Sequence, residues 1–210
     1  MWQLLYVWFA GLGISFLGQL PLGNINLTAT QLSVQENVRN AWNYGIGIVL
    51  VEIIYLRLAL TGMDWVVQHQ NLFQLLGWIT VAVFITLGIV AFWMARKQRS
   101  DQKGLLLNNK LDRFLLGAMV SAVNPAQIPF WFLWSTQLLD ANILFPTDSQ
   151  YNLFTFGAGM GSICGLAVYI HGGKWIIEKM NASNRGLNIF MGVVFLFAGL
   201  YQLYQMLSGN

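Results

Sequence analysis

The stretch Gln19-Leu-Pro-Leu-Gly-Asn-Ile-Asn-Leu-Thr-Ala-Thr-Gln31 decides how this chain is organised. It closes an apolar run, and within it Pro21 and Gly23 are followed by polar residues where a membrane-spanning helix would be uniformly apolar. Proline removes a backbone donor and blocks a helical hydrogen bond, and glycine lets the chain bend. In a bilayer such a break persists only where it faces protein or a water-filled cavity. The stretch therefore predicts a functional break in the first helix.

The composition is that of a membrane protein. Of the 210 residues, 56% are hydrophobic and 9% are charged, against roughly 25% charged in soluble domains. The basic residues lie between apolar runs and form no concentrated basic face, so we expect no nucleic-acid partner. The single Cys164 cannot form an intramolecular disulfide, and His69 and His171 lie far apart. We therefore predict neither a cofactor nor a bound metal.

Six apolar runs are long enough to cross a bilayer, which takes about 17 to 25 residues. They cover about 2–20, 42–60, 72–94, 114–139, 153–170 and 187–207. The first run has no positive segment before it and no small-residue cleavage site after it, so we interpret it as a retained helix. The expected fold is all-α, a polytopic membrane protein with six transmembrane helices in one transporter domain, 1–210.

The distribution of basic residues predicts the orientation of the chain. Of the 11 Lys and Arg residues, all but Arg57 fall in the connections after the first, third and fifth runs, whereas the connections 61–71 and 140–152 contain none. Cytoplasmic loops carry an excess of Lys and Arg, so we expect those three loops in the cytoplasm and both termini outside. Arg57 lies near the outer end of its helix and can reach the interface. We interpret the basic loop, about 96–113, as a topology signal that meets anionic lipid rather than a docking site.

A second break indicates an internal repeat. Ser121-Ala-Val-Asn-Pro-Ala-Gln-Ile-Pro129 interrupts the fourth run, and a glycine-spaced helix follows each break. Three spans per half is an odd number, so the two halves must have opposite topology. Paired breaks in inverted halves indicate a transporter site at the midplane of the membrane. We expect repeat one at about 1–95 and repeat two at about 114–210.

Glu52 lies about ten residues into the second run, close to the centre of the bilayer. Placing a carboxylate there is unfavourable by roughly 2.5–3.5 kcal/mol on insertion scales, so such a residue is a functional candidate. It could carry a proton, or balance an ammonium group on a solute. The structural alternative is a pair with Arg57 or a protonated acid packed in the bundle. Positions five apart differ by about 140° around a helix, so Arg57 is a poor partner.

The two breaks expose backbone groups that could hold a small zwitterion, because half-helix ends carry partial charge. The alternative is two ordinary kinks in which side-chain amides cap the freed backbone groups. We interpret the glycines around Gly157 as a helix-packing face, and a substrate-stacking role for Trp131 or Trp134 is a secondary reading. The predicted substrate-binding residues are Pro21, Gly23, Asn24, Asn26, Thr28, Asn124, Pro125 and Gln127.

The residues resemble the LysE/RhtB family of small exporters, LysE-type translocators that extrude amino acids across bacterial cytoplasmic membranes. The resemblance covers essentially the whole chain. The family pattern has Pro-Gly at the first break and Asn-Pro-Lys at the second, whereas Leu22 separates Pro21 and Gly23 here and Ala126 and Gln127 follow Pro125. The motifs are Leu20-Pro-Leu-Gly-Asn24, Gly45-Ile-Gly47 with a mid-membrane acid, Asn124-Pro125, and Leu187-Asn-Ile-Phe-Met-Gly192 with Gly199.

The resemblance implies a secondary transporter that exports amino acids or similar small zwitterions across the bacterial inner membrane. We expect proton antiport through Glu52, with a cation or metal-ion exporter of the wider superfamily as the alternative. The sequence has no Ser/His/Asp set and no His-Glu-x-x-His motif, so an intramembrane enzyme is not expected. The expected partners are an amino-acid-like substrate and the lipid bilayer, and the interpretation allows a homodimer.

Overall fold

The computed structural model describes residues 2–20, 23–96 and 111–208, and within these ranges it is helical with short turns and no strand. This confirms the predicted all-α class. The eight helices of the described ranges are α1 (Trp2–Gln19), α2 (Asn24–Gln35), α3 (Val38–Gln68), α4 (Gln70–Arg96), α5 (Arg113–Ala122), α6 (Gln127–Asp140), α7 (Asp148–His171) and α8 (Gly173–Ser208).

Three segments in the described ranges are long and apolar enough to cross a membrane, namely Val38–Met63, Gln70–Trp93 and Asp148–His171. Two shorter apolar helices are Arg113–Ala122 and Gly192–Ser208. The first and fourth predicted runs both lie on helices that end at a break, α1 before α2 and α5 before α6. The predicted connection 61–71 is helical except at His69, which caps α3 before α4 begins. It contains no proline, so helical hydrogen bonds continue through its polar residues on both sides of that point.

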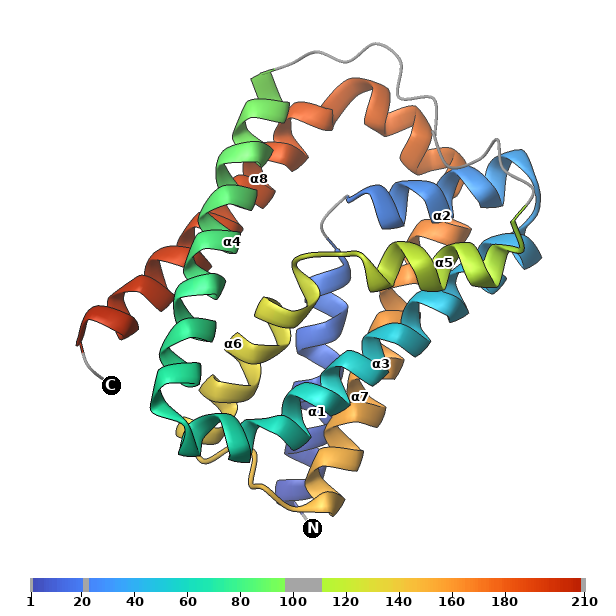
Figure 1. The fold of residues 1–210 in the computed structure, drawn as a ribbon. Helices are drawn as coiled ribbons and strands as arrows, with labels where there is room; N and C mark the ends of the chain where they lie inside the picture. Colours follow the sequence, from blue (N-terminus) through green and yellow to red (C-terminus); the bar gives the residue numbers. More distant parts are fainter. Residues whose placement is uncertain (1, 21–22, 97–110, 209–210) are drawn as a thin grey trace.

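The helices divide into two groups (Figure 1). In one group α4 packs along α8, and in the other α1 packs along α7 while α3 packs along α5. Helix α6 lies between the groups and contacts both α3 and α4, and α2 lies across the ends of α3 and α7. In Figure 1, α6 lies in the middle of the bundle, whereas α2 and α5 lie toward the end away from the N-terminus.

Close backbone contact holds α1 against α7. A Cβ atom added at Gly11 would lie 2.3 Å from the carbonyl oxygen of Phe154, and one added at Gly157 would lie 2.2 Å from that of Trp8. Small residues at such positions let two helix backbones approach each other in a membrane. This contact agrees with the packing role predicted for the glycines of α7.

The same contact recurs between α3 and α5. A Cβ atom added at Gly47 would lie 2.2 Å from the carbonyl oxygen of Phe114, and one at Gly117 would lie 2.0 Å from that of Tyr44. Glycines from both helices therefore fix each pair, and α7 adds a further one, since a Cβ atom at Gly161 would lie 2.2 Å from the carbonyl oxygen of Leu12.

We expect Gly117→Ala to destabilise the protein by about 1–3 kcal/mol, because the added methyl group meets backbone that cannot rotate away. Gly13→Ala is the matched control, since a Cβ atom there meets nothing within 4 Å. Thermal unfolding in detergent compares the two variants, and equal melting temperatures would contradict the proposed contact.

An ion pair outside the apolar spans joins α2 to α5. The Arg113 guanidinium donates from Nε to Glu36 Oε2 at 3.1 Å and from Nη2 to Oε1, and Asn40 Nδ2 donates to Oε2 at 2.8 Å. Burial alone would raise the pKa of Glu36, but the hydrogen bonds from Arg113 and Asn40 and the charge of Arg113 outweigh it. The pKa of Glu36 therefore lies below its ordinary value of 4.5.

Because the folded protein lowers this pKa, the ion pair stabilises the fold above pH 4.5 and loses that effect as the pH falls through the lowered value. We expect Glu36→Gln to lower the unfolding free energy by at most about 1 kcal/mol at neutral pH, as for other partly exposed pairs. The difference from the unmodified protein should shrink progressively as the pH is lowered below 4.5. Arg113→Gln should show the same loss, and a double mutant with fully additive losses would argue against the pairing.

Candidate functional site

The site centres on Glu52, a buried acid of α3 whose residue is 8% exposed. Its Oε2 accepts hydrogen bonds from Ser162 Oγ at 2.5 Å and Gln19 Nε2 at 3.0 Å, and its Oε1 accepts one from Ser15 Oγ at 3.3 Å. The two serine hydroxyls lie 2.6 Å apart. Helices α1, α3 and α7 each supply part of this cluster, so the acid lies where the two glycine-packed helix pairs meet.

Neutral groups provide every hydrogen bond that the described structure gives this carboxyl group. Arg57 on the same helix does not pair with it, because its Nη2 lies 3.2 Å from Asp148 Oδ1 at the start of α7. The Arg57 guanidinium carbon also lies 5.6 Å from the centre of the Tyr151 ring. The expectation that Arg57 is a poor partner for Glu52 is therefore confirmed.

The cluster can satisfy both protonation states of Glu52. When the group is ionised, Gln19 and Ser162 donate to Oε2 and Ser15 donates to Ser162 Oγ, because two hydroxyl oxygens 2.6 Å apart need a hydrogen between them. When it is protonated, its O–H can donate to Ser162 Oγ, which donates to Ser15 Oγ, which donates to Glu52 Oε1. Either serine can act as donor in the contact between them, so no heavy atom has to move. Glu52 could therefore gain or lose a proton without leaving a buried polar group unsatisfied.

Gln19 connects this cluster to the first break. Its side chain donates to Glu52, and its backbone carbonyl accepts a hydrogen bond from Asn26 Nδ2 at 2.5 Å. The next carbonyl, that of Leu20, accepts one from the hydroxyl of Tyr169 on α7. The carbonyl groups freed at the end of α1 are thus held by side chains from α2 and α7.

The structure places some of the predicted residues of the first break, and others lie outside the described residues. Gly23 is the N-cap of α2 with extended backbone, φ −95° and ψ 176°. Asn26 and Thr28 are buried on α2 at 3% and 4% exposure. Pro21 lies outside the described residues, as does the side chain of Asn24, whose backbone begins α2.

The second break lies between α5 and α6. Asn124 Oδ1 accepts a hydrogen bond from the backbone N–H of Ala126 at 3.1 Å, and Pro125 is exposed. Gln127 begins α6, is 8% exposed and donates to Ser121 Oγ at 2.8 Å. Asn124 therefore closes the turn itself, whereas Gln127 points back along α5.

Helix α3 ties the second break to the Glu52 cluster. Ser121 Oγ donates to the carbonyl oxygen of Ile48 at 3.3 Å, and the hydroxyl of Tyr55 donates to that of Ala122 at 2.9 Å. A tyrosine from α3 thus holds the end of α5, as Tyr169 from α7 holds the end of α1. Of the predicted break residues, Asn26 is linked to the cluster through Gln19, and Gln127 is linked to α3 through Ser121.

Sequence reasoning missed several members of the cluster, because serine and glutamine at helix positions are common and carry no motif. One signal was present, since Gly11 and Ser15 have the same spacing as Gly117 and Ser121 at the corresponding place before the second break. The residues missed as site members are Ser15, Gln19, Ser162, Tyr55 and Tyr169.

A protein-family model described as "LysE type translocator" matches residues 16–206 of the chain. The chain has no match among curated proteins or among solved structures. The match covers both breaks, Glu52 and Ser162.

We expect Tyr169→Phe to lower the unfolding free energy by about 1–3 kcal/mol, because the Leu20 carbonyl loses its buried donor. Tyr204→Phe is the matched control, since Tyr204 is 70% exposed on α8. Thermal unfolding of the purified variants measures the difference. Equal stability of the two variants would show that the hydroxyl of Tyr169 does not hold the break.

Proposed function

Because the chain belongs to the LysE type translocator family, we propose that this transporter exports amino acids or similar small zwitterions by proton antiport. The family makes it a membrane transporter, and the substrate and the coupling ion are our proposal. The proposed location is the bacterial cytoplasmic membrane, with both termini outside as the distribution of Lys and Arg indicates.

The observation that carries the proton-coupling proposal is the environment of Glu52. The acid is buried, no described basic side chain pairs with it, and its neutral donors can satisfy it in either protonation state. A group that must bind and release a proton in each transport cycle needs two stable hydrogen-bonded states. An acid paired with a fixed cation would be held in the ionised state instead.

The contacts of the glycines support two inverted repeats. Gly11 and Gly117 make equivalent contacts with α7 and α3, as do Gly157 and Gly47 with α1 and α5. Under this equivalence Glu52, five residues after Gly47, corresponds to Ser162, five residues after Gly157. Two equivalent residues that touch each other must lie beside the axis that relates the repeats. Transporters with inverted repeats have their binding site at this interface between the repeats.

The breaks supply groups suited to a zwitterion. The N-terminal end of α2 presents partial positive charge, and the ends of α1 and α5 present partial negative charge at their carbonyl groups. We propose that the eight predicted break residues bind the substrate around these ends. They are Pro21, Gly23, Asn24, Asn26, Thr28, Asn124, Pro125 and Gln127.

The alternative substrate, a metal cation, fits the Glu52 cluster poorly. Ligand oxygens in an octahedral Mg²⁺ site are about 3 Å apart, and larger ions spread them further. Here Ser162 Oγ lies 2.5 Å from Glu52 Oε2 and 2.6 Å from Ser15 Oγ, which is hydrogen-bond spacing. Within the described ranges there is also no group of three or more His, Cys, Asp or Glu that could hold a metal.

We expect Glu52→Gln to abolish export driven by a pH gradient while preserving the fold, because glutamine occupies the same space but cannot carry the proton. The measurement uses membrane vesicles loaded with a panel of amino acids, dipeptides and metal ions. Exchange of labelled for unlabelled amino acid should persist in the variant, since it moves no net protons.

Asp148→Asn is the control for this experiment, because it removes an exposed carboxylate at the start of α7 whose surface ion pair with Arg57 contributes little to stability. Its gradient-driven export should match that of the unmodified protein. If Glu52→Gln responds fully to the pH gradient, the role of Glu52 in proton coupling is refuted. If only metal ions are carried, the amino-acid proposal is wrong.

A further inference from the structure

Three buried polar atoms of α6 lack hydrogen-bond partners among the described residues. They are Gln127 Oε1, Trp131 Nε1 and Ser135 Oγ. Their residues are 8%, 0% and 0% exposed, respectively. An isolated atom of this kind can be an imperfection of packing, but each case in a folded protein calls for an explanation, such as an absent water or ligand.

The three atoms come from one face of one helix. Each residue follows the previous one by four positions, which advances about 6 Å along the helix and turns only about 40° around it. The polar face begins with Gln127 at the second break and extends over about 12 Å toward the Asp140 end of α6. We call these three residues the α6 polar face.

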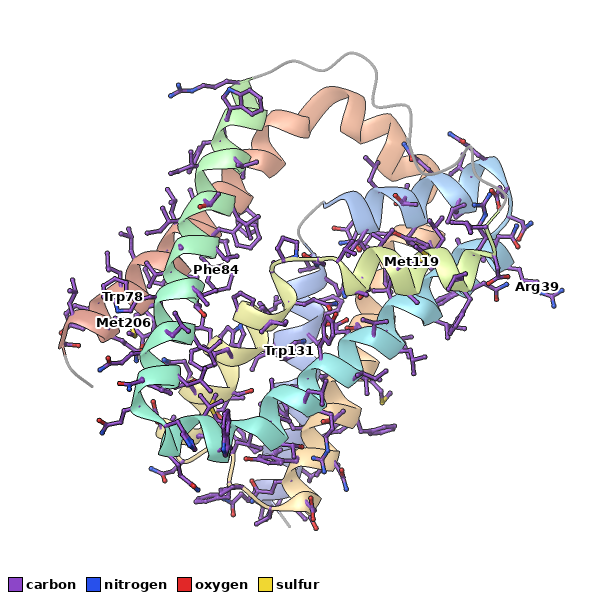
Figure 2. The ribbon with its side chains drawn as sticks, in the orientation of Figure 1. Arg39, Trp78, Phe84, Met119, Trp131 and Met206 are labelled. Carbon is purple, nitrogen blue, oxygen red and sulfur yellow. The ribbon has the colours of Figure 1, made fainter. Side chains whose placement is uncertain are left out.

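This face is directed into the bundle. Trp131 lies in the middle of the molecule (Figure 2), in a buried cluster with Val7 of α1, Leu56 of α3 and Phe154 of α7. Its ring meets that of Phe154 edge to face, with centroids 6.3 Å apart. Trp131, the middle residue of the α6 polar face, therefore packs in a cluster with the same three helices that form the Glu52 cluster.

Packing alone does not explain the unpaired hydroxyl of Ser135. The next residue, Thr136, is also buried, and its Oγ1 donates to the carbonyl oxygen of Phe132 one turn earlier at 2.8 Å. Helix α6 can therefore satisfy a hydroxyl from within, but the hydroxyl of Ser135 has no such partner. A buried hydroxyl that remains unpaired is unfavourable unless something else binds it during function.

We propose that the α6 polar face lines the solute path between the second break and the Asp140 end of α6, and that Trp131 and Ser135 bind the passing solute. This proposal rests on the proposed function and extends its binding site along the helix. The face offers an acceptor at Gln127, a donor at Trp131 and a hydroxyl at Ser135, without a charged group. Such a lining suits a small zwitterion with no net charge, whose ammonium and carboxylate groups need an acceptor and a donor.

The first test compares stability with transport. Ser135→Ala and Trp131→Phe each remove an unpaired polar atom. We expect an unchanged or higher melting temperature for Ser135→Ala, because the unpaired hydroxyl binds only solute. Trp131→Phe should lower the melting temperature, because it leaves a cavity in the core. Both variants should show at least about a fivefold fall in amino-acid exchange. Trp134→Phe is the control on the same helix, since Trp134 is 36% exposed, and its exchange should stay within about twofold of the unmodified protein.

Unchanged exchange in Ser135→Ala and Trp131→Phe would overturn the proposal and leave the α6 polar face as a packing feature. Loss of exchange together with a large loss of stability in Ser135→Ala would overturn it as well, because the hydroxyl would then have a structural partner. Ser135→Ala removes a single oxygen, so it remains informative if Trp131→Phe folds poorly.

The second test detects the path without any transported solute. In a Cys164→Ser background, we expect Ser135→Cys to react with 2-aminoethyl methanethiosulfonate in membrane vesicles, because the thiolate forms only where water reaches it. Trp134→Cys, toward the outside of the bundle, should react at least about tenfold more slowly in the apolar bilayer. Absence of labelling at Ser135→Cys would overturn the proposal. Labelling without amino-acid exchange would retain the path and refute the proposed substrate.

Discussion

The structure depends on one buried carboxyl group that is held by neutral donors. Glu52 is enclosed by Ser15, Gln19 and Ser162, and these residues come from the helices that flank it on either side. A charge at this depth is unfavourable unless hydrogen bonds compensate it. The neutral donors of the cluster compensate the charge but do not require Glu52 to stay ionised. An ion pair, in contrast, would hold the acid in its ionised form.

Helix packing makes this cluster possible. Hydroxyl groups 2.6 Å apart on α1 and α7 require the two backbones to be close, and Gly11 and Gly157 provide that approach. The same contact between α3 and α5 brings Ser121 within hydrogen-bond distance of the Ile48 carbonyl. The glycines therefore determine the chemistry of the site indirectly, because they set the distance between the helices that carry its polar groups.

Much of this arrangement follows from local patterns that a single sequence contains. Proline beside asparagine located both helix breaks, with Gly23 as a further signal at the first, and the depth of Glu52 in an apolar run identified it as a candidate. The family resemblance read from these motifs is confirmed by the match over residues 16–206. The helical class follows from the length of the apolar runs.

The partners of Glu52 could not be read from the sequence, because they come from helices that are distant along the chain. Ser162 is 110 residues from Glu52, and only the packing of α3 against α7 brings the two together. In the sequence, Gln19 is only the first residue of the predicted break. In the structure its side chain donates to Glu52 and its backbone carbonyl accepts from Asn26. The extent of helix α3 beyond its apolar run was missed for a related reason, since helical hydrogen bonds continue through polar residues until something blocks them.

The glycine contacts also determine which parts of the molecule can move. Two helices whose backbones touch cannot slide past each other without first separating, so we expect α1 to move together with α7, and α3 together with α5. Helices α2 and α6, which follow the breaks, contain no glycine, so neither makes a glycine contact of this kind from its own side. During a transport cycle we therefore expect α2 and α6 to rotate about the breaks while the two helix pairs keep their internal packing. The hydroxyls of Tyr169 and Tyr55, which bind the carbonyl groups at the ends of α1 and α5, would hold the breaks between these movements.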